Sequence, residues 1–156
     1  MSTVSVMAVD PGLTVGAAYL RRDWAHDSWQ VGVAEAIVTM KYVIRSMKPD
    51  LVVVERFQIT PDTVKKTRQY DALEVIGALR YECLEHDVPF ELQVKNAAFK
   101  LGNTQRLCAL GWYRPGKEHA NVASGHLALA LVRHSKLHPD VTQRVVRAAT
   151  IGTLRA

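Results

Sequence analysis

The sequence LVVVE at positions 51–55 places four apolar residues directly before a glutamate. Three consecutive valines favour a strand, and a strand without polar side chains is typically buried on both faces, as in a parallel sheet. Ligand sites in such sheets lie at the carboxyl ends of the strands. A charge there must be paired, solvated or bound to a cation. Glu55 is therefore a candidate site residue, with an ion pair to Arg56 as the alternative.

A second acid follows an earlier strand. The apolar run at positions 4–8 leads to Asp10 and a Pro-Gly turn, after which residues 14–20 form a second strand and residues 25–31 a weaker third. An acid at a strand end beside a glycine is a common feature of open sites. The alternative is a turn aspartate that accepts backbone N–H bonds.

The remaining pattern predicts helices and further strands. Apolar residues at spacings of three and four predict a helix at 33–47. The other predicted elements are a helix at 63–86, a strand at 90–94, short helices at 96–101 and 104–110, and a helix at 117–137. This order predicts a single α/β domain over residues 1–156, with a mixed five-stranded sheet (three antiparallel strands, then two parallel) and helices on both faces. Residues 138–156 have weak helical periodicity and are a candidate C-terminal extension.

Charge is divided unevenly along the chain. Residues 1–94 carry 10 Lys and Arg against 13 Asp and Glu, whereas residues 95–156 carry 10 against 2. A basic half on a small domain favours a polyanionic partner, usually nucleic acid, although a solubilising surface gives the same pattern. Two cysteines without metal-site spacing, no signal-peptide pattern and no long apolar run favour a reducing cytoplasm.

The two acids suggest a metal site. If their strands run parallel at the centre of the sheet, Asp10 and Glu55 become neighbours, and adjacent carboxylates repel each other unless a proton or a cation lies between them. Hard oxygen ligands with an incomplete protein shell suit Mg²⁺ or Mn²⁺. Such ions activate water and stabilise the leaving oxygen in phosphodiester hydrolysis.

The helix predicted at 117–137 is polar at its start and apolar further on, so its first turns can supply further site residues. Glu118 and Asn121 share a helix face, and so do His119 and His126. Two turns separate the histidines by ~10 Å, so both cannot easily bind one ion. This helix therefore offers Glu118, His119, Asn121 and His126 as candidates to complete the site. A helix-start acid and a buried, hydrogen-bonded histidine are the alternatives for Glu118 and His126.

Together these segments resemble the RuvC family of Holliday-junction resolvases, which belong to the RNase H-like nucleases. VDPG at 9–12, with a glycine at 16, is similar to the family's first acidic motif, and LVVVERF at 51–57 is similar to its second. ELQVK at 91–95 and KLG at 100–102 are similar to its strand, basic helix start and glycine turn.

The resemblance spans about residues 3–137 and departs from the family in the last acidic motif. The family places an acid or a histidine there, followed three residues later by an aspartate. Counting from Glu118 gives Asn121, and counting from His119 gives Val122. The missing aspartate suggests a divergent branch, such as a phage-encoded protein acting in the cytoplasm of a bacterial host.

The resemblance implies a metal-dependent endonuclease that hydrolyses phosphodiesters in branched DNA during recombination and repair. The expected reaction is resolution of four-way junctions by symmetric nicking, carried out by a homodimer with two active sites. Asp10, Glu55 and Glu118 would hold Mg²⁺ or Mn²⁺. These three residues and His119 would form the catalytic set.

The resemblance also places the helix predicted from position 63 beside the DNA. Its Lys65, Lys66 and Arg68 would contact phosphates, which positions DNA without reading bases. Phe57 would stack on an unpaired base, although it fits a place in the core equally well. Further basic residues that would extend this surface are Lys95, Lys100, Arg106, Arg114 and Lys117. An ordinary solvated helix start is the alternative for the first cluster.

Three other functions fit parts of the same pattern. A nuclease with broader specificity for branched DNA or RNA:DNA hybrids would keep the fold and the metal site. A nucleic-acid-binding module that has lost catalysis would account for the missing aspartate. A fragment of the actin-like ATPase class also opens with Asp and Gly on a hairpin. The sequence has no phosphate-binding Gly-Lys-Ser/Thr loop, however, and its basic half suits nucleic acid better than ATP.

Overall fold

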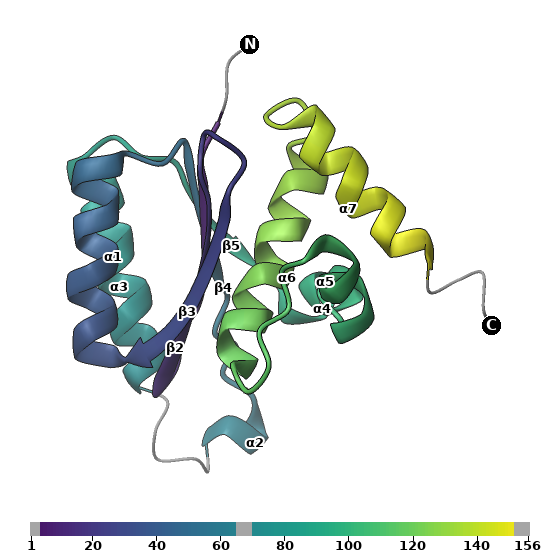
Figure 1. The fold of residues 1–156 in the computed structure, drawn as a ribbon. Helices are drawn as coiled ribbons and strands as arrows, with labels where there is room; N and C mark the ends of the chain where they lie inside the picture. The colour runs from purple at the N-terminus through teal and green to yellow at the C-terminus, as the bar shows by residue number, and fades with distance from the viewer. Residues whose placement is uncertain (1–3, 65–69, 152–156) are drawn as a thin grey trace.

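A mixed sheet forms the centre of the molecule (Figure 1). The computed structural model describes residues 4–64 and 70–151, and within them five strands lie in the order β3-β2-β1-β4-β5. The strands are β1 (Val6–Asp10), β2 (Thr14–Leu20), β3 (His26–Gly32), β4 (Leu51–Glu55) and β5 (Phe90–Gln93). β1, β2 and β3 pair antiparallel, whereas β4 pairs parallel with both β1 and β5. This confirms the predicted sheet, in which the two acids end neighbouring parallel strands.

Helices cover both faces of the sheet, as expected (Figure 1). α1 (Val33–Met47) and α3 (Tyr70–Glu85) lie on one face. The helices on the other face are α4 (Lys95–Leu101), α5 (Thr104–Leu110), α6 (Glu118–Arg133) and α7 (Pro139–Ile151). The single turn α2 (Pro61–Val64) follows β4. α6 packs directly on β1 and β2.

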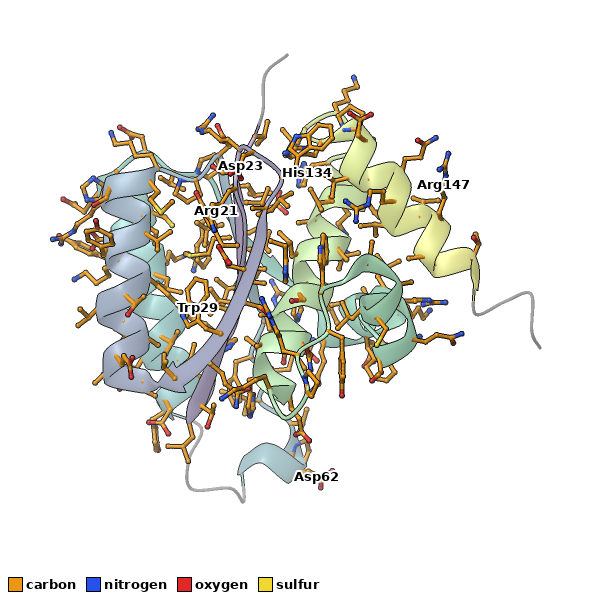
Figure 2. The ribbon with its side chains drawn as sticks, viewed as in Figure 1. Arg21, Asp23, Trp29, Asp62, His134 and Arg147 are labelled. Atoms are coloured by element: carbon orange, nitrogen blue, oxygen red, sulfur yellow. The ribbon has the colours of Figure 1, made fainter. Side chains whose placement is uncertain are left out.

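The alternation of side chains along each strand decides which helix layer an acid meets. In β1, Val6 and Ala8 belong to the core cluster shared with α6, while Met7 and Val9 belong to the cluster beneath α1 and α3. Figure 2 shows Trp29 of β3 on the α1 side of the sheet. Because Asp10 lies two residues after Ala8, its side chain faces α6.

Two glycines allow α6 to approach its neighbours closely. A Cβ atom on Gly16 of β2 would lie 1.9 Å from the carbonyl oxygen of His119. A Cβ atom on Gly102, at the end of α4, would lie 2.4 Å from the Cα atom of Gly125. The first turn of α6 is therefore held against the sheet, and its middle against α4, by contacts that exclude any side chain.

Three predicted segments differ from the structure or fall outside it. The helix predicted at 63–86 is described only as the turn α2 and as α3. Lys65, Lys66 and Arg68 lie outside the described residues. The helix predicted to reach 137 ends at Arg133.

The C-terminal segment forms an amphipathic helix that packs on the domain, so the weak helical periodicity expected there was wrong. Val141, Val145 and Ala148 of α7 are buried in the core cluster shared with α5 and α6. Their spacings of four and three residues place them on one helix face. Within the two described ranges, no helix has the length and apolar character needed to cross a membrane.

Candidate functional site

The candidate site is built on a row of residues that crosses the sheet. Asp10 pairs with Gly16 of β2, and Gly16 pairs with Gln30 of β3. On the other side, Glu55 pairs with Gln93 of β5. The parallel pair Val9–Val54 brings the following residues, Asp10 and Glu55, side by side at the carboxyl ends of β1 and β4. We call Gln30, Gly16, Asp10, Glu55 and Gln93 the polar row.

Polar side chains are tolerated in this row because it lies at the end of the strands, beneath the first half of α6. Glu55 lies two residues after the buried Val53 and so faces α6, as Asp10 does. In β1 and β4 the apolar residues therefore lie in the core, and the last residue that faces α6 lies at the candidate site. This confirms the expected juxtaposition of the two strand ends.

His119 binds the first acid. Its Nδ1 atom lies 2.8 Å from Oδ2 of Asp10. The backbone N–H of His119 donates to Oε1 of Gln30 at 3.1 Å, so the first turn of α6 is tied to the polar row at two points. The His119 side chain is 45% exposed, whereas that of Asp10 is 10% exposed. His119 is therefore accessible to a molecule that approaches the acid.

His126 binds the second acid from within the core. Its Nε2 atom lies 2.9 Å from Oε2 of Glu55, and its Nδ1 atom lies 3.0 Å from Oε1 of Gln93. His126 is fully buried, so it contacts Glu55 from the core and is not accessible to a large ligand. The two histidines were expected to lie too far apart to bind one ion, and in the structure each of them contacts a different carboxylate.

Gln93 fixes the orientation of the His126 ring. Both ring nitrogens face side-chain oxygens, while the buried Nε2 atom of Gln93 has no partner among the residues described. Rotation of the Gln93 amide would let that nitrogen donate to Nδ1 of His126, leaving Nε2–H to donate to Glu55. In either orientation the amide keeps the ring pointed at the carboxylate, as partners beyond the ligands of a metal site do.

The electrostatics of the pair favour a bound cation. Burial is the largest influence on the Asp10 carboxyl and raises its pKa. The hydrogen bond with His119 acts in the opposite direction, and the negative charge of Glu55 raises the pKa further. Holding both carboxylates ionised therefore costs free energy, which a cation between them would offset.

The donor set fits Mg²⁺ or Mn²⁺ with an incomplete protein shell. Asp10 and Glu55 supply hard oxygen ligands, and Mg²⁺ is commonly bound through one or two carboxylates, with waters and phosphate completing its shell. Within the described ranges, no group of three or more His, Cys, Asp and Glu side chains is arranged to hold a metal ion. The third ligand expected from Glu118 stays a prediction.

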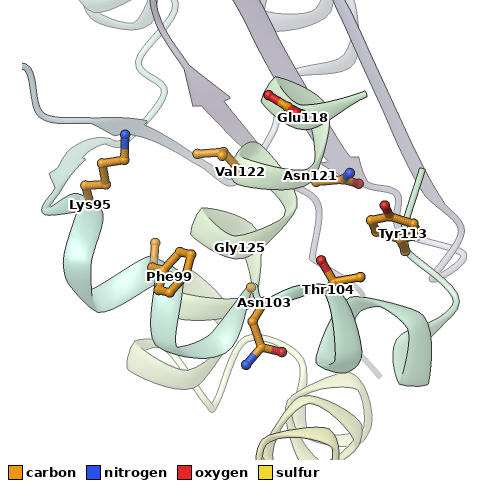
Figure 3. Close-up of a pocket in the computed structure, with 11 residues that line it drawn as sticks. Lys95, Phe99, Asn103, Thr104, Tyr113, Glu118, Asn121, Val122 and Gly125 are labelled. Carbon is orange, nitrogen blue, oxygen red and sulfur yellow. The ribbon is translucent and has the colours of Figure 1, made fainter. Parts of the chain in front are cut away.

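Glu118 and Asn121 face away from the polar row. Glu118 is exposed and lines a cavity between α4 and α6, together with Asn121 (Figure 3). The Asn121 amide is used inside the protein: Oδ1 accepts from the backbone N–H of Arg114 at 2.8 Å, and Nδ2 donates to its carbonyl at 2.9 Å. Asn121 therefore anchors the loop before α6.

Of the residues predicted to contact DNA, Phe57, Lys95 and Lys100 lie within the described ranges, in the segments that follow β4 and β5. Phe57 is half-buried just after β4. Lys95 and Lys100 are exposed in the first and last turns of α4, and Lys95 also lines the cavity. Their contacts with DNA stay predictions.

Sequence reasoning gave no role to two residues of the site, Gln30 and Gln93. Gln93 lay within a quoted motif, and Gln30 within the weakest predicted strand. The available signal was their register. Each is a polar residue at an α6-facing position, in line with Asp10 and Glu55 across the sheet.

Comparisons with solved structures identify the fold. Thermus thermophilus RuvC in complex with a Holliday junction substrate superposes with a TM-score of 0.65 at 14% identity, covering 86% of this chain and 97% of that one. A second Thermus thermophilus RuvC structure gives a TM-score of 0.61 at 16% identity, covering 85% and 97%. No protein-family model and no curated protein matches the sequence. The chain therefore has the RuvC fold, an RNase H-like α/β fold, at low sequence identity.

Proposed function

We propose that this protein is a divalent-cation-dependent endonuclease that hydrolyses phosphodiesters in branched DNA, with the four-way junction as its preferred substrate. One observation carries the proposal: Asp10 and Glu55 lie side by side at the carboxyl ends of two parallel strands. They do so in a fold shared with a RuvC protein whose structure contains a Holliday junction substrate.

In this proposal Asp10 and Glu55 hold Mg²⁺ or Mn²⁺. When bound, the ion supplies charge stabilisation at the phosphate and activation of water. Gln30 fixes the first turn of α6 and so positions His119, while Gln93 and His126 position the Glu55 carboxylate.

Two residues of the first turn of α6 have roles closer to the substrate. His119 is half exposed beside Asp10, which suits a group that accepts a proton from the attacking water. Glu118 is the proposed further ligand, and it would have to turn from the α4 side of the helix to reach the two acids.

The basic C-terminal half supplies the proposed contacts with the DNA backbone. Lys95 and Lys100 project from α4 on the same face of the sheet as α6. Lys65, Lys66 and Arg68 belong to the same proposed surface, and Phe57 is its candidate stacking residue. A homodimer would place two such sites on one junction and give symmetric nicks, in the cytoplasm of a bacterial host if the protein is phage-encoded.

A nucleic-acid-binding module without catalysis is the second candidate. It is favoured by the lack of a three-ligand group in the described part of the chain, and by the histidine that holds each acid. In that case the two acids would be held by histidines alone, and junction binding would not lead to cleavage.

The test is cleavage of a synthetic four-way junction, a flap, a linear duplex and an RNA:DNA hybrid of matched sequence. Each substrate is incubated with the protein in Mg²⁺, in Mn²⁺ and in EDTA, with Asp10→Asn as the catalytic control. We expect paired nicks at symmetric positions in the junction, dependent on the cation and absent in the variant. Junction binding without cleavage in either cation would support the second candidate. Faster cleavage of the hybrid than of the junction would make the hybrid the preferred substrate.

A further inference from the structure

A cavity of about 340 Å³ opens beside the first turns of α6 and is not used by the site described above. Figure 3 shows it between α4, α5, the loop before α6 and α6 itself. Its volume lies at the lower end of the range for small-ligand pockets, roughly 300–1,000 Å³. Glu118 lines the cavity and is the neighbour of His119, which contacts Asp10, so the cavity adjoins the candidate active site.

Two aromatic side chains form opposite sides of this cavity (Figure 3). Phe99, from α4, is 69% exposed, and Tyr113, from the loop after α5, is half-buried. Phe99 therefore presents an accessible aromatic surface beside the cavity. Flat apolar walls of this kind suit a planar ring.

The floor of the cavity is fixed by the packing of the helices. Gly102 and Gly125 both line it, and their backbones touch so closely that a side chain on Gly102 would meet the Cα atom of Gly125 at 2.4 Å. The space is therefore bounded by rigid helix contacts, and a ligand would enter between the aromatic walls.

The polar groups of the cavity favour a ligand without net charge. The two asparagines are used inside the protein, because Asn103 caps α5 through Arg106 and Asn121 holds Arg114. The exposed Lys95 and the exposed Glu118 carry opposite charges, so the two charged side chains of the lining balance. A nucleobase is an uncharged planar ring with polar groups at its edge, which matches this arrangement.

We propose that the cavity takes up one unpaired nucleobase of a bound DNA strand, stacked between Phe99 and Tyr113, with Lys95 at a neighbouring phosphate. The inference rests on the proposed function, because it assumes that the strand also passes Asp10 and Glu55. The captured base belongs to the strand near the phosphate to be cut, since Glu118 of the cavity is the sequence neighbour of His119. The cavity thereby sets which base at the crossover is accepted.

The position of the cavity favours a base within a DNA strand over a free mononucleotide. Residues 95–156, which supply every residue of its lining, carry 10 Lys and Arg against 2 Asp and Glu. Such an excess of positive charge suits a polyanion that extends beyond the cavity on both sides.

The experiment uses junctions that carry a single 2-aminopurine at successive positions around the crossover. Fluorescence is measured on binding of the full chain in EDTA, so that no strand is cut. The variant is Phe99→Leu, which changes an exposed side chain and keeps the fold. Its matched control is Tyr42→Leu, which replaces an aromatic residue of similar exposure on α1, on the opposite face of the sheet.

We expect a strong increase in fluorescence at one or two positions in the wild-type complex and in Tyr42→Leu, because a base that leaves the DNA stack is no longer quenched by its neighbouring bases. The increase should be lost in Phe99→Leu. Junction affinity should fall by about tenfold in Phe99→Leu, as expected for one lost stacking contact. An equal increase in Phe99→Leu and wild type, or an increase at no position, would overturn the inference. Reversal of the increase by free mononucleotide at concentrations that leave the junction bound would support it, by placing the base in an independent pocket.

Cleavage assays with the same proteins separate this inference from the proposed function. Cation-dependent cleavage with identical base preference in wild type and Phe99→Leu would overturn the base pocket and leave the nuclease standing. A position-specific fluorescence increase that depends on Phe99, with no cleavage in Mg²⁺ or Mn²⁺, would support the pocket and overturn the nuclease.

Discussion

Two buried acidic sites in this molecule have opposite electrostatic character. Glu82 lies between α1 and α3 with its side chain 1% exposed, and it contacts the guanidinium of Arg45, Nζ of Lys41 at 3.5 Å and Nε2 of His86 at 3.1 Å. The hydrogen bond from Arg45 is the main reason that the pKa of Glu82 is lowered. Asp10, at the other site, has a histidine partner and a second carboxylate beside it, and its pKa is raised, mainly by burial and further by the charge of Glu55.

The difference separates an acid compensated within the protein from the two acids of the proposed cation site. Arginine and lysine carry charge at neutral pH, so Glu82 has its negative charge compensated within the protein. Histidine gives only conditional compensation, and in the proposed function an added cation supplies the rest at Asp10 and Glu55. The predictions below compare the Glu82 cluster with the Asp10–Glu55 pair, from the largest expected effect to the smallest.

The largest effect should come from Asp10→Asn. We expect it to reduce cation-dependent cleavage by more than about 100-fold, since even indirect partners in metal sites cost 10- to 100-fold. Junction binding should survive, because the basic surface is unchanged. The measurement is single-turnover cleavage of a labelled junction, with Glu82→Gln as the control that keeps its activity. Cleavage at the wild-type rate in Asp10→Asn would remove this residue from the mechanism.

The next effect concerns the amide that orients His126. Gln93→Ala should weaken Mn²⁺ binding by about 10- to 100-fold, because the ring that holds Glu55 loses its partner. The measurement is isothermal titration with Mn²⁺. His134→Gln is the matched control, since His134 makes a partly exposed pair with Glu91 at 2.8 Å, away from the polar row. Equal Mn²⁺ affinity in Gln93→Ala and His134→Gln would show that Gln93 has no positioning role.

The third effect concerns the stability of the fold and the acid Glu82. Glu82→Gln should lower the free energy of unfolding by about 1.5–3 kcal/mol, the usual contribution of hydrogen bonds to charged groups. The loss should lie toward the lower value because Arg45 and Lys41 are partly exposed and can be solvated. Urea unfolding measures it. A variant as stable as the wild type would mean that the cluster contributes nothing to the fold.

Stability should also depend on pH with opposite sign at the two sites. The lowered pKa of Glu82 means that its contribution is present above its ordinary value of 4.5 and is lost as the pH falls through the folded-state pKa. The raised pKa of Asp10 means that its ionisation disfavours the folded state as the pH rises through the folded-state pKa.

Unfolding measured at several pH values without divalent cations checks this difference. Asp10→Asn should be at least as stable as the wild type at neutral pH, and the difference should vanish in acid. Glu82→Gln should instead be less stable at neutral pH and approach the wild type in acid. Parallel pH profiles for the two variants would contradict the assignment of opposite roles.

The smallest effect is expected on the proposed DNA-contacting surface, which belongs to neither acidic site. Lys100→Ala should weaken junction binding to a similar degree for all sequences and reduce the slope of log K against log salt by about 1, as for one phosphate contact. Fluorescence anisotropy at several salt concentrations measures this slope. An unchanged slope would place Lys100 outside the DNA interface.

The sequence predicted the part of the site that depends on strand ends. Runs of apolar residues before Asp10 and Glu55 indicated two buried strands, and parallel pairing of these strands made the acids neighbours. The expectation for His126 left two roles open, and the structure combines them, because the residue is a buried histidine whose hydrogen bond is to a site acid.

The parts that could not be predicted depend on contacts between distant segments. The partnership of Gln93 with His126 joins β5 to α6 across 33 positions, and no local pattern specifies it. α7 is buried through Val141, Val145 and Ala148, which share one face of a helix of low mean hydropathy. This burial requires the surface that α5 and α6 provide. The orientation of Glu118 toward α4 depends on the position of α6, which requires the close backbone approaches at Gly16 and Gly102.

The most direct test of the central claim is the change in melting temperature that Mn²⁺ causes in three proteins. A cation shared by Asp10 and Glu55 should raise the melting temperature of the wild type and of Glu82→Gln by the same amount, roughly 5–10 °C at a hundredfold excess over Kd. Asp10→Asn should show no rise. An equal rise in Asp10→Asn would contradict the account, because the cation would then bind elsewhere.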